Sequence, residues 1–123
     1  MTGYLRPILF VFLGGAVGTT LRFSVGVAGD AVGVSSLLSV LAVNIVGAFA
    51  LGWFTASRAA ESIHLNAFLA AGLLGSFTTF SAYAVEIVDL GSSDQMALGA
   101  AYAAGSIMLG VAAAVIGRSV ATA

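Results

Sequence analysis

The sequence carries little charge for its length. Only 7% of its 123 residues are charged, whereas about 25% are charged in typical soluble domains. A soluble domain of this size keeps much of its surface in water, and these few charged groups could not cover such a surface. Because apolar residues make up 60% of the chain and the mean hydropathy is +1.12, we expect lipid to surround most of it.

Three residue types are absent or nearly absent, and each absence excludes a class of function. Without cysteine the chain has no disulfide framework, thiolate nucleophile or cysteine metal site. The single histidine, His64, excludes the usual zinc clusters. The chain has no lysine, and its net charge of -1 lacks the basic footprint of a nucleic-acid-binding protein. Since the remaining side chains offer no nucleophile–base pair, we expect neither an enzyme nor a nucleic-acid partner.

The few charges divide the chain into long apolar stretches. A membrane-spanning helix needs about 20 mostly apolar residues, and these stretches are too long and continuous for barrel strands. We therefore predict an all-α membrane protein in which residues 1–123 form a single integral-membrane domain. Its four transmembrane helices are expected at about 7–29, 37–57, 65–88 and 96–117. The short connections leave no room for another domain, so the function is expected to lie within the bilayer.

The segment Gly75–Ser81 (GSFTTFS) is the most informative part of the third predicted helix. It places one glycine and four hydroxyl side chains near the bilayer midplane. Hydroxyls there can bond to their own helix, but four together favour a broken helix. Irregular backbone at that depth must be buried in protein or line a polar cavity. Free carbonyl groups at such a break would suit a cation, and free N–H groups or hydroxyls would suit an anion.

Asn44 and Arg22 are polar groups deep in predicted spans, and each carries two interpretations. Asn44 is either an interhelical hydrogen-bonding group or a pore-lining donor that cannot be titrated. Arg22 lies roughly 6 Å from the midplane of the first helix, at 1.5 Å per residue. Its side chain either extends to the interface or provides a functional charge inside the membrane.

Aromatic and hydroxyl side chains form two further faces. Phe80 and Tyr83 are three residues apart and share a helix face, which Glu86 continues towards the membrane surface. Inward-turned ring edges would suit an anion and ring faces a cation, although aromatics also pack simply against lipid. Tyr102 and Ser106 are four residues apart and share a face of the fourth helix.

Four motifs spread along the chain share one resemblance. They are GGAVG at residues 14–18 followed by Arg22, Asn44 with Gly47 and Gly52, the segment Gly75–Ser81, and Glu86. Together they resemble the Fluc/CrcB family of fluoride channels, and the four-span layout covers the whole chain. The Gly75–Ser81 motif is the specific one, because glycines in the first helix mean little without it.

The resemblance implies both an assembly and a function. It implies a dual-topology dimer, with antiparallel subunits, a third helix broken near the midplane and two narrow anion pores. The protein would be a fluoride-selective passive channel of the cell membrane that exports cytoplasmic fluoride and relieves its toxicity. A structural sodium ion at the dimer interface would be held by the backbone carbonyls of Gly75 and Thr78. Further residues would line the pore (Asn44, Thr79, Phe80, Ser81, Tyr83, Tyr102 and Ser106) or provide vestibule charge (Arg22 and Glu86).

Three positions depart from the family pattern. Tyr83 stands where the family usually has phenylalanine, and Val40 stands where it has a threonine. Gly110 interrupts the hydroxyl series of the fourth helix. The resemblance therefore implies a shorter polar track here, with an additional hydroxyl among the pore aromatics.

Two other functions explain part of the pattern. A small proton-coupled multidrug exporter also has four spans and forms antiparallel dimers, but its exchange needs a glutamate deep in the first helix, where this chain has no acid. A membrane assembly protein without transport would explain the glycines. It would leave the clustered hydroxyls, Asn44 and the aromatics unexplained.

The arginines bear on how the chain inserts. Four spans place Arg6, Arg58 and Arg118 on one side of the membrane, which favours cytoplasmic termini. An antiparallel homodimer needs little such bias, and the nearby Glu61 could offset Arg58. The alternative is a heterodimer with an oppositely oriented sister subunit. We favour the homodimer, because three charges are a modest signal.

Overall fold

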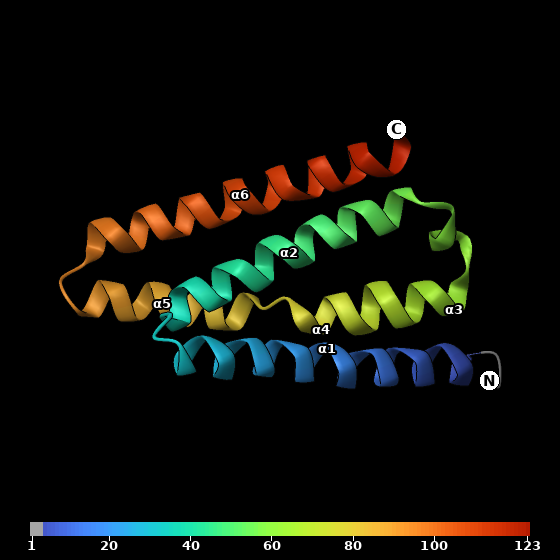
Figure 1. Cartoon of the computed structure of the whole chain (residues 1–123), viewed down its shortest axis with the longest axis horizontal. Helices are drawn as coiled ribbons and strands as arrows, with labels where there is room; N and C mark the ends of the chain where they lie inside the picture. Colours follow the sequence, from blue (N-terminus) through green and yellow to red (C-terminus); the bar gives the residue numbers. More distant parts are fainter. Residues whose placement is uncertain (1–3) are drawn as a thin grey trace.

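The computed structural model describes residues 4–123 and, at Arg58, the backbone alone. Its described residues contain four helical segments that are long and apolar enough to cross a membrane. They are Leu5–Ala31, Ser36–Ala56, Ile63–Ser92 and Met96–Thr122 (Figure 1). The prediction of an all-α chain with four membrane helices is thus confirmed. The segments extend a few residues beyond most of the predicted bounds, and the first includes Asp30 in its last turn.

Three of the segments are continuous helices, and the third is composite. The continuous ones are α1 (Leu5–Ala31), α2 (Ser36–Ala56) and α6 (Met96–Thr122). A short 3₁₀ turn, η2 (Arg58–Glu61), leads into the third segment, which consists of α3 (Ile63–Leu65), the π-helix η3 (Asn66–Leu74), α4 (Gly75–Phe77) and α5 (Phe80–Ser92). Between α4 and α5, Thr78 and Thr79 have extended backbone, with ψ angles of 157° and 120°.

The pairing of the helices places residues 6, 58 and 118 at one end of the bundle. These are the three arginine positions predicted to share one side of the membrane. α2 lies along α6, and α1 lies along η3 and α4. Figure 1 shows both termini and η2 at one end of the bundle and the other two connections at the opposite end. Arg6 and Arg118 therefore belong to one end and Asp30 and Asp89 to the other. The side chain of Arg58 lies outside the described part of the chain.

Glycines allow α1 to approach the π-helix η3 at backbone distance. A Cβ atom added to Gly14 would collide with the carbonyl oxygen of Phe68, and one added to Gly18 would collide with that of Leu73. Small residues permit such approach where no hydrophobic force drives helices together. The glycines at the two ends of the GGAVG motif are therefore used for packing within the subunit.

The contact between α2 and α6 follows the same rule in both directions. A Cβ at Gly52 of α2 would collide with the Ala114 carbonyl of α6, and one at Gly117 of α6 would collide with the Phe49 carbonyl of α2. The two helices thus interlock at two points along their length. In contrast, Gly105 has no atom within 4 Å of such a Cβ, so the subunit leaves that position open.

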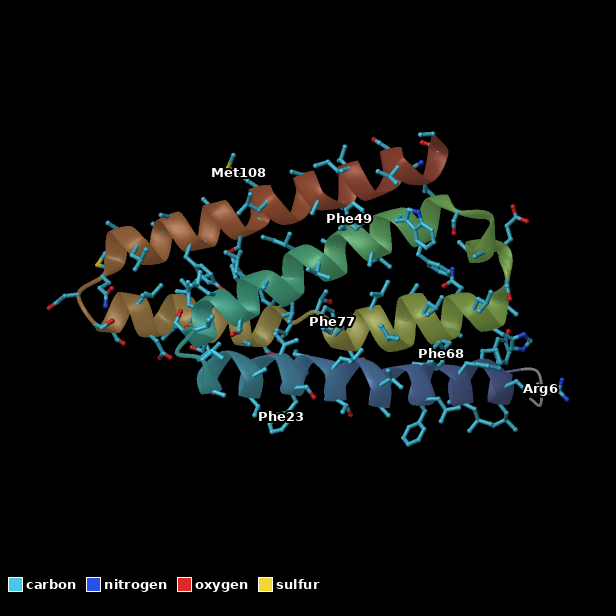
Figure 2. The ribbon with its side chains drawn as sticks, viewed as in Figure 1. Arg6, Phe23, Phe49, Phe68, Phe77 and Met108 are labelled. Atoms are coloured by element: carbon cyan, nitrogen blue, oxygen red, sulfur yellow. The ribbon has the colours of Figure 1, made fainter. Side chains whose placement is uncertain are left out.

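Large apolar side chains cover the outside of the bundle. Phe23 and Met108 point away from it, and each is 72% exposed (Figure 2). The buried side chains are fewer, and several of them, such as Tyr83 and Tyr102, carry a polar group. An apolar exterior around a partly polar interior is the arrangement expected for a protein in lipid.

Candidate functional site

Asn44 of α2 holds the interruption between α4 and α5. Its Oδ1 accepts a hydrogen bond from the Thr79 backbone N–H at 2.8 Å, and its Nδ2 donates to the Thr79 carbonyl at 3.0 Å. One amide thereby satisfies both backbone groups of a residue in extended conformation, as buried backbone requires. One N–H of the Asn44 amide remains for another acceptor.

The four hydroxyls of Gly75–Ser81 divide into two pairs. Ser76 Oγ lies 2.6 Å from the Gly72 carbonyl and 3.0 Å from the Gly15 carbonyl of α1, and Thr78 Oγ1 donates to Leu74 at 3.0 Å. The hydroxyls of Ser76 and Thr78 therefore bond to carbonyls of residues earlier in the chain. In the second pair, Thr79 Oγ1 accepts from the Ala82 backbone N–H at 3.1 Å and lies 3.2 Å from Ser81 Oγ. Thr79 thus caps the start of α5.

A cleft of about 350 Å³ lies beside the interruption, between α2, α5 and α6. We call it the Phe80 cleft. Its lining combines apolar residues with one amide, three serine or threonine hydroxyls and two aromatic rings. The lining residues are Asn44, Gly47, Ala48, Leu51, Thr78, Thr79, Phe80, Tyr83, Ser106 and Ile107. No ionisable carboxyl or basic side chain lines it.

Three aromatic rings lie in series at this cleft. The ring centroids of Phe80 and Tyr83 are 5.7 Å apart, and those of Tyr83 and Tyr102 are 5.6 Å apart. The Tyr83 hydroxyl donates to the Ala103 carbonyl at 2.9 Å, and the Tyr102 hydroxyl donates to the Leu37 carbonyl at 3.4 Å. Both phenol hydrogens are therefore engaged with backbone. Phe80, by contrast, is 79% exposed.

Ser106 provides the cleft's unused donor. Its hydroxyl oxygen is buried and has no hydrogen-bond partner among the described residues. Buried polar groups are nearly always paired, so an unpaired hydroxyl in a cleft is available to bond an ion or a water molecule. The Ser106 hydroxyl and the spare N–H of Asn44 both belong to the lining of the same cleft.

A second cleft, of about 300 Å³, lies between α1, α2 and α5. We call it the Arg22 cleft. It is lined by Thr19, Arg22, Phe23, Gly26, Ser39, Val40, Val43, Thr79 and Ala82. Thr79 is the residue that lines both clefts, and this places its side chain between a charged cavity and an uncharged one.

The structure separates the predicted site residues into groups. Asn44, Thr79, Phe80, Tyr83 and Ser106 meet in the Phe80 cleft. Of the other predicted residues, Ser81 and Tyr102 contact members of that cleft, Arg22 lines the second cleft, and Glu86 lines neither. Sequence reasoning missed Ser39 of the Arg22 cleft, although a serine inside an otherwise apolar stretch was an available signal.

Comparison with known proteins identifies the family that this chain resembles. Residues 9–118 match the family described as CrcB-like protein, Camphor Resistance (CrcB). The chain belongs to the CrcB family. The match covers all of the residues of both clefts in this CrcB chain, and the sequence-based identification is confirmed.

Individual relatives are similar along almost their whole length. A fluoride-specific ion channel FluC of Paracoccus denitrificans (strain Pd 1222) is 38% identical over 116 residues, which cover 94% of this chain and 94% of the relative. A FluC of Rhizobium etli (strain CIAT 652) is 40% identical over 114 residues, covering 89% and 91%. A fluoride-specific ion channel FluC 2 of Leifsonia xyli subsp. xyli (strain CTCB07) is 37% identical over 118 residues, covering 91% and 81%. With its four apolar helices, this CrcB chain is a multi-pass protein of the cell membrane.

Proposed function

We propose that this chain forms a fluoride-selective passive channel that exports cytoplasmic fluoride and so relieves fluoride toxicity. Relatives named fluoride-specific ion channels cover about nine tenths of the chain. The observation that carries the proposal is the unpartnered Ser106 hydroxyl in a cleft shared with Asn44 and Phe80. These groups are neutral donors, which is the chemistry a small anion needs inside a membrane.

Fluoride holds its water tightly, so a pore must replace that water with fixed donors. The Phe80 cleft offers a hydroxyl hydrogen from Ser106, an amide hydrogen from Asn44 and the positive edge of the Phe80 ring. The lining has no carboxylate to repel an anion. Passive flow is sufficient for export, since a 100 mV interior-negative potential favours outward movement of a monovalent anion by about 2.3 kcal/mol.

The proton-coupled exporter fits the structure less well. Its exchange needs a carboxyl group deep in the first helix, and the acid that α1 does contain, Asp30, lies in the last turn. Neither cleft has an Asp or Glu in its lining. A passive anion channel needs no carboxyl group along its pathway. The chemistry of the two linings therefore favours a channel over an exporter, and it also favours a channel over an enzyme.

An antiparallel dimer would complete the Phe80 cleft. Phe80 is 79% exposed on the isolated subunit, and a polar cleft that opened directly to lipid would leave the Asn44 and Ser106 donors beside hydrocarbon. A second subunit of opposite orientation closes it. We favour a homodimer over pairing with a sister subunit, and a C-terminal reporter that labels from both sides of the membrane is the expected result. Labelling from the cytoplasmic side alone, with flux only after a sister chain is added, would establish the heterodimer instead.

A structural sodium ion between the subunits is also part of the proposal. In a continuous helix, the Gly75 carbonyl would accept from the Thr79 N–H and the Thr78 carbonyl from the Ala82 N–H. Asn44 and the Thr79 hydroxyl take these two donors instead, so both carbonyls are freed for a hard cation, which prefers oxygen ligands. We expect sodium, compared with a large organic cation, to raise the thermal stability of the dimer. Equal stability in both would remove the ion from the proposal.

Flux from liposomes tests the function directly. Protein reconstituted with a fluoride gradient should discharge it when a potassium ionophore relieves the charge, and a chloride gradient should remain nearly unchanged. A gradient of a toxic organic cation serves as the third arm. Equal fluoride and chloride fluxes would refute selectivity, cation exchange would favour the exporter, and no flux would favour an assembly protein.

A further inference from the structure

Ser39 is a buried polar residue outside the Phe80 cleft that the proposed pathway has not yet used. It lies in the first turns of α2, is 8% exposed, and lines the Arg22 cleft. Its backbone N–H donates to the Ser35 carbonyl at 3.1 Å. Its hydroxyl makes no hydrogen bond within the described residues. The oxygen itself is not among the fully enclosed polar atoms, so a ligand or water in the cleft can reach it and complete its hydrogen bonding.

Other helical hydroxyls in this chain behave differently. Thr20, Ser24, Thr55 and Ser119 are exposed, and each donates to the carbonyl four residues earlier at 2.8–3.0 Å. A hydroxyl that faces hydrocarbon has its own helix as its available partner. Ser39 departs from this pattern although it lies in an equally apolar helix, and its departure coincides with its place in a cleft.

Gly29 of α1 makes room for the Ser39 hydroxyl. A Cβ atom added to Gly29 would lie 2.5 Å from Ser39 Oγ and would displace it. Among the residues that α2 contributes to the cleft, Val40 and Val43 are apolar. Ser39 is therefore the donor from α2, and the glycine opposite keeps space beside it.

The rest of the Arg22 cleft is suited to negative charge. Arg22 lines it, and Thr79 and Ala82 bring the start of the 13-residue helix α5 to it. A helix N-terminus carries partial positive charge and attracts anions. No Asp or Glu lies in the lining. A positive side chain, a helix start and an unpartnered hydroxyl thus surround one space.

We propose that the Ser39 hydroxyl donates a hydrogen bond to an anion held in the Arg22 cleft, and that this cleft is an entry site for the conducted anion. There the anion exchanges one water ligand for the Ser39 hydroxyl before it passes Thr79 into the Phe80 cleft. Arg22 supplies attraction, and Ser39 supplies a directed donor that favours the smallest anion. The inference rests on the proposed channel function.

The test compares Ser39→Ala, Ser39→Thr and the control Ser24→Ala, whose hydroxyl bonds its own helix on the exposed side of α1. Fluoride flux from liposomes is measured over a series of fluoride concentrations. A hydrogen bond to a charged group is strong enough that its loss in Ser39→Ala should raise the half-saturating fluoride concentration about tenfold. Ser39→Thr should restore it, and Ser24→Ala should match the unaltered protein. Thermal stability should be unchanged in all three.

Two results would overturn the entry site. One is a Ser39→Ala variant with the same half-saturating concentration as the unaltered protein. The other is an equal loss of maximal flux and thermal stability that Ser39→Thr does not restore, which would make Ser39 a packing residue. Both require an unaltered protein that conducts fluoride, so they are distinct from failure of the channel proposal, in which the unaltered protein carries no fluoride at all.

Discussion

The two halves of the third membrane segment, Ile63–Phe77 and Phe80–Ser92, differ in what they contact. The first lies along α1, where the carbonyls of Phe68 and Leu73 meet Gly14 and Gly18 without intervening side chains. The second begins at the Asn44-held interruption and contributes Phe80 and Tyr83 to a cleft. Backbone contact fixes the first half, while side-chain donors and rings distinguish the second. We therefore expect the fold to depend most on the first half and the ion selectivity of the proposed channel to depend on the second.

The largest effect should come from filling the contact between α1 and the first half. In Gly18→Ala, the added methyl group meets the Leu73 carbonyl, which belongs to backbone and cannot rotate away. We expect a loss of about 3 kcal/mol or more in stability, seen as loss of the single peak of the folded protein in size-exclusion chromatography. Gly91→Ala is the control, because a Cβ there has no atom within 4 Å. A well-folded, fully active Gly18→Ala protein would contradict the comparison.

The next effect should come from the residue that holds the interruption. Asn44→Asp removes the donor to the Thr79 carbonyl and places a negative charge beside the anion path. Fluoride flux should fall by more than about tenfold, because both changes oppose the anion. The matched control is Asn66→Asp in the first half, whose amide donates to Ala60 at an exposed site. Equal flux from both variants would show that Asn44 does not serve the pathway.

Phe80→Ile should affect conduction more than folding. Isoleucine keeps an apolar side chain but removes the positive ring edge, and the site is exposed on the subunit. We expect fluoride flux to fall about tenfold while the size-exclusion peak of the folded protein is retained. Phe12→Ile, at a similarly exposed position of α1, is the control and should conduct normally. Normal flux from Phe80→Ile would return that ring to a packing role.

The smallest effect should come from Tyr83→Phe. The Tyr83 hydroxyl donates to the Ala103 carbonyl at 2.9 Å, so its loss should reduce thermal stability by about 1 kcal/mol. The ring remains beside Phe80 and Tyr102, and the fluoride flux should stay within about twofold of normal. A flux loss as large as that of Phe80→Ile would mean that the hydroxyl itself serves the ion.

The sequence predicted those features that depend on neighbours along the chain. Uncharged length identified four helices, and three-residue spacing put Phe80 and Tyr83 together, as their 5.7 Å ring separation shows. The same spacing put Glu86 on that face, but the cleft does not extend to it. The helical repeat predicts the direction in which a side chain points around the helix axis. It does not predict where the neighbouring helices close the cavity.

Contacts between distant segments could not be predicted. Asn44 and Thr79 are 35 residues apart, and only the packing of α2 against the interruption brings the amide onto both backbone groups of Thr79. The role proposed for Ser39 could not be predicted for the same reason, because it depends on Gly29 and Arg22, which belong to α1. The sequence left two interpretations of Asn44 open, an interhelical hydrogen-bonding group or a pore-lining donor. The structure is compatible with both, because the Asn44 amide bonds Thr79 and keeps one N–H that can donate to another acceptor.

The π-helix η3 has a consequence for how the chain tolerates insertions and deletions. Its bonds span five residues where an α-helix uses four, so Asn66–Leu74 holds more residues per turn than its neighbours. Removing one residue from an α-helix turns everything beyond it by about 100°. Removing one from η3 can instead be absorbed as a return to α-helical winding, which would leave the directions of Gly75, Thr78 and Phe80 nearly unchanged. A one-residue deletion in η3 would thus turn Gly75, Thr78 and Phe80 least, while it would shift the Phe68 and Leu73 carbonyls that contact α1.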